Sequence, residues 1–167
     1  MRHIQSFPPI ERADARILIL GSMPGEASLR AGQYYAHPRN LFWRIMGELL
    51  GIDPASPYKQ RAQALKSARI ALWDVLHSCR RKGSLDSSID GASLVPNDLA
   101  AFFLRHPEIT HVFFNGSKAE ECYRKHVRPA TGIETIEYLR LPSTSPANAS
   151  ISYERKLEAW RVITTCA

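Results

Sequence analysis

The sequence of 167 residues lacks several features that would assign it to a particular class of protein. No apolar run reaches membrane-spanning length, and the first 16 residues, "MRHIQSFPPIERADAR", lack the apolar core of a secretory signal. Cys79, Cys122 and Cys166 are widely spaced and form no CxxC pair, which argues against a disulfide framework and against a zinc or iron–sulfur site. With no repeats or low-complexity tracts either, we expect one domain over residues 1–167, reduced thiols, no metal and a cytoplasmic location.

Acidic residues are the scarcer charged class, at 16 against 22 lysines and arginines, and the net charge is +6. This excess suits an anionic partner such as nucleic acid, although many basic proteins bind none. The basic clusters at residues 80–82 and 124–128 could either contact such a partner or form a solvated face.

Four short apolar runs, at residues 16–20, 68–73, 110–115 and 136–142, are predicted strands. The first three are nearly continuous, which is typical of strands buried on both faces, whereas the fourth is more mixed and is expected nearer an edge. Helical spacing of apolar residues lies between and after them, at residues 40–51, 56–68, 96–107, 117–127 and 152–166. This alternation predicts an α/β fold, a three-layer α/β/α sandwich with a central, mainly parallel four-stranded sheet.

Polar segments follow each predicted strand, and parallel sheets bind their ligands outside the carboxyl ends of the strands. The four segments are "GSMPGEASL", "WDVLHSC", "NGSKAEE" and "LPSTSPANAS". Asp74 and Asn115, at the ends of the second and third strands, either cap the following turn or hydrogen-bond a ligand. We therefore expect one site assembled from four separate segments.

Two of these segments have a possible role in anion binding. Gly21 and Gly25 of "GSMPG" allow tight turns and close approach of a ligand, and free backbone amides there could hold an oxyanion or a phosphate. The spacing fits neither a P-loop nor a dinucleotide fingerprint, and an ordinary strand-to-helix turn accounts for it equally well. In "LPSTSPANAS", prolines stiffen a loop whose hydroxyls could contact phosphates; alternatively, Asn148 or Ser150 simply caps the last helix.

The segment "QYYAHPRNLFW", residues 33–43, gathers aromatic, histidine and asparagine side chains close to the first turn. Tyr34 and Tyr35 are either core residues or stacking platforms for a planar ring. His37 could be an acid, a base or a phosphate contact, but a lone histidine is more often structural. Asn40 could cap the following helix or orient a water molecule.

Taken together, these segments resemble the uracil-DNA glycosylase superfamily. "GSMPG" stands where that superfamily has its first motif, a Gly-x-x-Pro-Gly/Tyr turn, and "LPSTSPAN" where it has the His/Asn-Pro-Ser loop that enters the minor groove. "YAHPRNLFW" resembles the HPxNxFW segment of mismatch-specific uracil- and thymine-DNA glycosylases. The closest resemblance is to the hypoxanthine-DNA (deoxyinosine) glycosylases, in which "GSMPG", "QYYAHPRNLFW", "LWDVL", "GSLD", "FFNG" and "LPSTSPAN" fall in this order over nearly the whole chain.

The resemblance implies a set of site residues, with one departure. Relatives that remove uracil commonly have Asp or Asn at the third position of the first motif, where this sequence has Met23, so we expect Asn40 to be the principal catalytic residue. Asp74 replaces an asparagine that reads the base in some relatives, and a carboxylate could accept from N1–H of hypoxanthine and reject adenine. The implied base-binding residues are Gly21, Ser22, Met23, Pro24, Gly25, Tyr35, His37, Asp74 and Asn115, and the implied DNA-binding residues are Ser143, Thr144, Ser145, Pro146, Ala147 and Asn148.

The resemblance thus implies a monofunctional glycosylase that flips a deaminated base, most simply hypoxanthine, out of double-stranded DNA and hydrolyses its N-glycosidic bond. No lysine lies at the matched motif positions, so lyase chemistry is not expected, and neither is a cofactor. We expect a monomer associated with the nucleoid. The alternatives are a uracil or mixed-substrate glycosylase, a non-catalytic binder of damaged DNA, and a hydrolase of free nucleosides.

Overall fold

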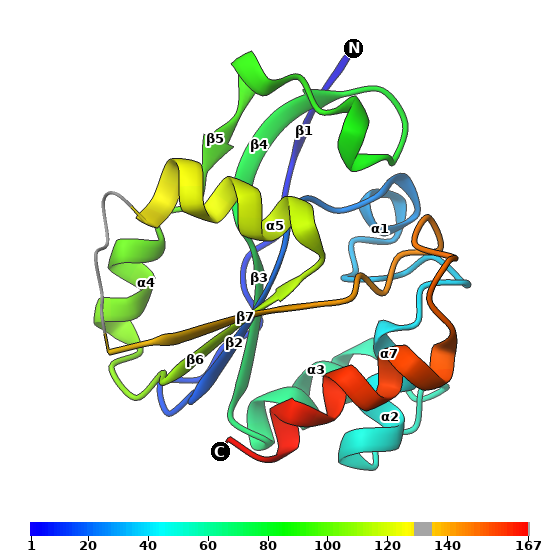
Figure 1. Cartoon of the computed structure of the whole chain (residues 1–167), viewed down its shortest axis with the longest axis vertical. Coiled ribbons are helices and arrows are strands. Elements are labelled where there is room, and N and C mark those ends of the chain that lie inside the picture. The colour runs from blue at the N-terminus through cyan, green and yellow to red at the C-terminus, as the bar shows by residue number, and fades with distance from the viewer. Residues whose placement is uncertain (129–134, 167) are drawn as a thin grey trace.

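The computed structural model describes residues 1–128 and 135–166, and a four-stranded parallel sheet forms its centre (Figure 1). The strand order is β3-β2-β6-β7, and every neighbouring pair is parallel, which confirms the predicted fold class. The register pairs Gly21 with Asp74 and Asn115 with Leu141, so the carboxyl ends of the strands meet at one edge as expected. The strands are β2 (Ile17–Gly21), β3 (Ile70–Asp74), β6 (His111–Asn115) and β7 (Glu137–Leu141).

Apolar side chains project from both faces of the sheet, because successive residues of a strand point to opposite faces. In β2, Leu18 and Leu20 join the core that packs against α4 and α5, whereas Ile17 and Ile19 join the core that packs against α2, α3 and α7. Figure 1 shows these two groups of helices on opposite sides of the sheet. The three-layer sandwich is therefore confirmed, with two cores rather than one.

The two edge strands differ in their exposure. Three of the five residues of β7 are exposed, which confirms the prediction for the fourth apolar run. In contrast, β3 is buried along its whole length, because Ile10 pairs with Leu72 across its outer edge. This cover explains why an edge strand carries the continuous apolar sequence of a central one.

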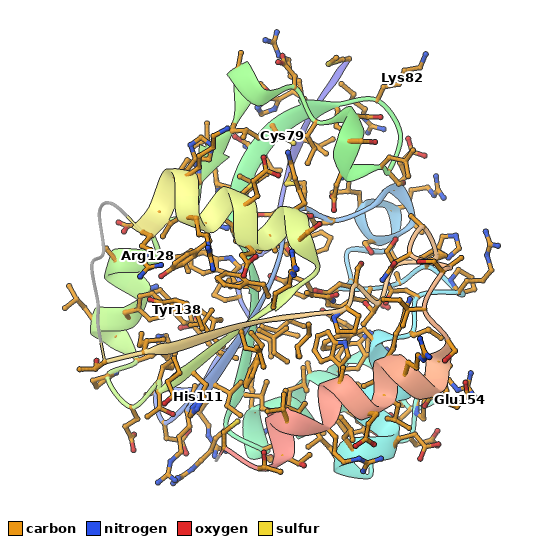
Figure 2. All side chains as sticks on the ribbon, viewed as in Figure 1. Cys79, Lys82, His111, Arg128, Tyr138 and Glu154 are labelled. Carbon is orange, nitrogen blue, oxygen red and sulfur yellow. The ribbon has the colours of Figure 1, made fainter. Side chains whose placement is uncertain are left out.

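A second, antiparallel sheet was not predicted. Its strands are β1 (Arg2–Gln5), β4 (Leu76–Arg81) and β5 (Val95–Pro96), in the order β1-β4-β5. Only Val75 separates β3 from β4, so the segment after Asp74, which was expected to be a loop, is a strand instead. Four of the six residues of its sequence "LHSCRR" are polar or charged, and Ser78 and Arg81 are buried nonetheless, so the sequence does not stand out as a strand. Cys79 of β4 lies inside the molecule, and Lys82 just beyond it projects outward (Figure 2).

Of the described α-helices, all except α1 lie close to their predicted places; α1 was not predicted. The helix caps are partly as expected. Gly51 ends α2 in the left-handed conformation, as its position suggested. The last helix is capped by Ser152, whose hydroxyl accepts from the Arg155 amide at 3.2 Å, so the alternative that Asn148 or Ser150 caps it is wrong. The α-helices are α1 (Glu26–Ala31), α2 (Phe42–Leu50), α3 (Tyr58–Ser67), α4 (Leu99–Arg105), α5 (Ser117–Cys122) and α7 (Tyr153–Trp160).

Shorter helical turns complete the described chain. A π-helical turn, η3 (Tyr123–Val127), continues α5, and η1 (Asp86–Ser88), η2 (Gly91–Ser93) and η4 (Arg161–Thr164) are 3-10 turns. Within residues 1–128 and 135–166, none of the helices has the length and apolar content needed to span a bilayer.

Candidate active site

A cavity of about 710 Å³ opens where the four parallel strands end. The last residue of each strand, Gly21, Asp74, Asn115 and Leu141, contributes to its lining. All of the residues that the sequence predicted as site residues line this one cavity: Gly21, Ser22, Met23, Pro24, Gly25, Tyr35, His37, Asn40, Asp74, Asn115, Ser143, Thr144, Ser145, Pro146, Ala147 and Asn148.

The missing side chain of Gly21 leaves space beside Asp74 and Tyr35 in the wall of the cavity. A methyl group at this position would lie 2.5 Å from Oδ1 of Asp74 and 2.8 Å from the hydroxyl oxygen of Tyr35. Both polar atoms therefore converge over bare backbone, and only glycine allows them to do so.

Asp74 carries a buried carboxyl group with one oxygen that lacks a hydrogen-bond partner among the described residues. The residue is 3% exposed, and its Oδ2 is buried with no hydrogen-bond partner among the described residues. Burial, and secondly the charge of Asp86, raise the pKa of Asp74 to about 7, while Arg81 opposes the shift. An unpaired buried acceptor at a cavity wall is costly, and a ligand that donates a hydrogen bond there would relieve that cost.

The sequence left open whether Tyr34 and Tyr35 are core residues or stacking platforms, and the two residues differ in the structure. Tyr34 is a core residue, since its hydroxyl donates to the Pro8 carbonyl at 2.9 Å and its own carbonyl accepts from the indole of Trp43 at 2.9 Å. Tyr35 has a left-handed backbone conformation (φ 55°), and its ring stacks on that of Phe42, with centroids 4.3 Å apart. Its buried hydroxyl lies near Asn115 without making a well-formed hydrogen bond.

The turn from His37 to Asn40 is held by its own side chains. Nδ1 of His37 accepts from the Arg39 amide at 3.1 Å, and Oδ1 of Asn40 accepts from the Phe42 amide at 3.0 Å. The N-cap position of α2 is Leu41, which makes no side-chain cap hydrogen bond, so Asn40 closes a local turn at the helix entrance and does not occupy the cap position. This contact fixes the Asn40 side chain and still leaves a lone pair on Oδ1 and the NH2 group for a ligand.

The side chain of Asn115 anchors the loop 142–148 through two hydrogen bonds to Thr144. Nδ2 of Asn115 donates to the hydroxyl of Thr144 at 3.0 Å, and its Oδ1 accepts from the Thr144 amide at 2.9 Å. Thr144 is fully buried and its carbonyl accepts from the Leu41 amide, so it anchors the loop rather than offering the predicted phosphate contact. Lys156, also buried, donates to the Asn148 carbonyl at 2.7 Å.

Asp86 is a polar residue of the cavity that was not among the predicted site residues. Asp86, from the segment between β4 and β5, accepts a hydrogen bond from the Ser22 hydroxyl at 2.7 Å. The segment "GSLD" includes it, but nothing in the residue pattern connects it to a turn 64 positions earlier. Met23 lies beside Ser22 and joins the hydrophobic core, so it presents no polar side-chain atom to the cavity.

No group of three or more His, Cys, Asp or Glu side chains is placed to hold a metal ion within the part of the chain that the structure describes.

Comparison with known proteins gives a consistent family. Residues 8–164 match the family model of the uracil DNA glycosylase superfamily. The chain is 40% identical over 153 residues to a hypoxanthine DNA glycosylase of Methanosarcina barkeri, covering 91% of this chain and 92% of that protein. It is 38% identical over 160 residues to a hypoxanthine DNA glycosylase of Methanosarcina acetivorans, covering 95% and 96%.

The fold has an equally clear counterpart. A solution NMR structure of a protein from Methanosarcina acetivorans, proposed to be a uracil DNA glycosylase, superposes with a TM-score of 0.82 at 35% identity and covers 99% of both chains. The chain therefore belongs to the uracil DNA glycosylase superfamily, whose members are DNA glycosylases of base excision repair.

Proposed function

We propose that the protein removes hypoxanthine from deoxyinosine in double-stranded DNA and leaves an abasic site. The observation that carries this choice is the carboxyl group of Asp74, which is 3% exposed, unpaired at Oδ2 among the described residues and placed beside Tyr35 over Gly21. A flipped purine that lies on Tyr35 would bring its edge to Asp74.

The proton pattern of the base decides what Asp74 accepts. Hypoxanthine carries a hydrogen on N1 and can donate it to the carboxylate, whereas adenine presents a lone pair at N1. An unpaired buried acceptor costs about 1–3 kcal/mol, and two facing acceptors cost more. Above its pKa of about 7, where Asp74 is ionised, it therefore favours the deaminated base over its parent. The test is the Asp74→Asn variant, in which the ratio of hypoxanthine to adenine release should fall; an unchanged ratio contradicts this role.

Asn40 is proposed to hold the attacking water. As water adds to the anomeric carbon, the bond to N9 breaks, the sugar becomes positively charged and the base departs with the electron pair. An amide is a poor base, so its contribution is to position the water. Its hydrogen bond to the Phe42 amide favours this role, because it fixes the side chain before the substrate arrives.

The loop 143–148 is proposed to contact the DNA backbone. Ser143 is partly buried and Ser145 partly exposed, and both hydroxyls already accept from amides within the loop, which leaves them free to donate to phosphate oxygens. The support from Asn115 and Lys156 holds this contact surface in shape without the DNA.

The test is a panel of duplexes that each contain one hypoxanthine, uracil, xanthine or adenine lesion or control, with wild type beside Asn40→Ala. We expect hypoxanthine release by the wild type, and a loss of about 100-fold or more in the single-turnover rate for Asn40→Ala. Asn40→Asp keeps an acceptor for the Phe42 amide, so it is the control for the loss of that hydrogen bond in Asn40→Ala.

Each failure of this panel has a distinct meaning. Tight binding of the lesion with no release by wild type would show a DNA-binding protein without catalysis. Faster release of uracil than of hypoxanthine would assign a uracil glycosylase. Hydrolysis of free inosine with none of the duplex would show a nucleoside hydrolase.

A further inference from the structure

The segment after β4, residues 82–88, forms a wall of the cavity and is fastened to the first turn. It is closed at its base, where Arg81 pairs with Ile89. The Arg81 guanidinium is buried and donates to the Pro24 carbonyl at 2.6 Å and to the Gly83 carbonyl at 2.7 Å, so it joins the two segments. Its neighbour Lys82 projects outward (Figure 2).

Two serine contacts complete this attachment. The hydroxyl of Ser84 accepts from the Glu26 amide at 2.9 Å, and the hydroxyl of Ser22 donates to Oδ1 of Asp86 at 2.7 Å. Oδ2 of Asp86 makes no hydrogen bond or ion pair among the described residues, and the side chain lines the cavity. A carboxylate is thus held firmly by one oxygen and left open at the other.

Asp86 and Asp74 differ in their environments within the cavity. Burial raises the pKa of Asp86, while the hydrogen bond from the Ser22 hydroxyl and the charges of Arg81 and Lys118 partly offset that rise. Asp74 lines the same cavity, and burial, followed by the charge of Asp86, raises its pKa. Among the described residues, Asp74 is thus buried without a partner for Oδ2, whereas Asp86 lies on the cavity wall with Oδ1 hydrogen-bonded to Ser22.

Negative charge next to the sugar favours hydrolysis of a glycosidic bond, because the transition state resembles an oxocarbenium ion. Asn40 carries no charge, and the Met23 side chain presents no polar atom. Asp86 is tied to the residue directly before Met23, so its free oxygen is held beside the first turn.

We propose that Asp86 is a second catalytic residue, whose carboxylate faces the sugar and the attacking water. This inference rests on the proposed function. As the water oxygen bonds to the anomeric carbon, the electron pair of the C1′–N9 bond leaves with the base. Asp86 takes the proton that the water loses and returns it to the departed base or to solvent.

The test measures single-turnover release of hypoxanthine by Asp86→Asn, together with its affinity for a duplex that carries a non-cleavable 2′-fluoro deoxyinosine. We expect the rate to fall about 100-fold or more, as is usual for a lost acid–base group, and the affinity to change less than about threefold. Asp90→Asn, in the same connection but paired with Arg80 outside the cavity, should retain the wild-type rate.

A second pair of variants separates chemistry from support. Ser22→Ala removes the hydrogen bond to Asp86 but keeps the carboxylate, so the single-turnover rate should fall less than about tenfold. Added formate should restore part of the rate of Asp86→Ala but none of the rate of Asn40→Ala. Equal losses in Ser22→Ala and Asp86→Asn without formate rescue, or an Asp86→Asn rate within about fivefold of wild type, would overturn the proposal. A wild type that releases no hypoxanthine would instead overturn the proposed function.

Discussion

Replacing Asp74 by asparagine should stabilise the protein, and increasingly so as the pH rises. Burial keeps the pKa of Asp74 at about 7 against its usual value of 3.8. Between these values the folded protein holds a proton that the unfolded chain has released, so the contribution of Asp74 to stability falls as the pH rises and is fully lost above pH 7. At about 1.4 kcal/mol for each pH unit, the loss reaches about 4 kcal/mol, which a side-chain amide at this position does not suffer because it does not ionise.

The assay is urea unfolding of wild type and Asp74→Asn at about pH 4.5, 6, 7.5 and 9, a series that spans the pKa of about 7. The variant's advantage should grow across the series to about 4 kcal/mol, or about 8–16 °C in Tm for a chain of this size. Taking the difference between two proteins cancels every other carboxyl group, and Asp90→Asn controls for the loss of one negative charge. An advantage that stays constant across the whole series would refute the reasoning, because an amide that merely packs better acts at every pH.

The contacts around the cavity lead to three further predictions. Gly21→Ala should reduce hypoxanthine release about 100-fold or more, because its methyl group would displace Asp74 or Tyr35; circular dichroism should show an intact fold, and near-wild-type rates would contradict the packing described. Asn115→Ala should lower the free energy of unfolding in urea by about 2–3 kcal/mol, because it leaves the buried Thr144 hydroxyl and amide unpaired, and a loss below about 0.5 kcal/mol would argue against this anchor. Tyr35→Phe should keep the single-turnover rate within about threefold of wild type, whereas Tyr35→Ala should lose most of it; equal losses would mean that the hydroxyl matters more than the ring.

The parallel sheet could be predicted because its strands are nearly continuous apolar runs. Residues 17–21 and 70–74 are buried at every position, and short runs of this kind between turn-forming residues are typical of strands covered on both faces. The small sheet was missed because most residues of β1 and β4 are charged or polar, and β5 has only two residues. The partner of β1 lies more than 70 residues away in the sequence, which local patterning cannot show.

The site was predictable in its location but not in its internal contacts. Strand ends and motif order placed Asn40, Tyr35 and Asp74 in one cavity. The residue pattern alone left the roles of Tyr34 and Tyr35 open, and only the resemblance selected Tyr35; the pattern could not show that Tyr35 has a positive φ angle. It also could not show Asp86, whose partner Ser22 belongs to a different segment.

The hydrogen bond from the Leu41 amide to the Thr144 carbonyl joins two segments that have separate duties in the proposed mechanism. In that mechanism one segment contacts the phosphates and the other holds Asn40, so a displacement of the first would reach the second through this backbone hydrogen bond. If undamaged DNA fits the loop 142–148 imperfectly, Asn40 would then hold the attacking water in the wrong position. The protein would thereby check the fit of the backbone as well as the identity of the base, and a tightly bound but badly seated duplex would escape uncut.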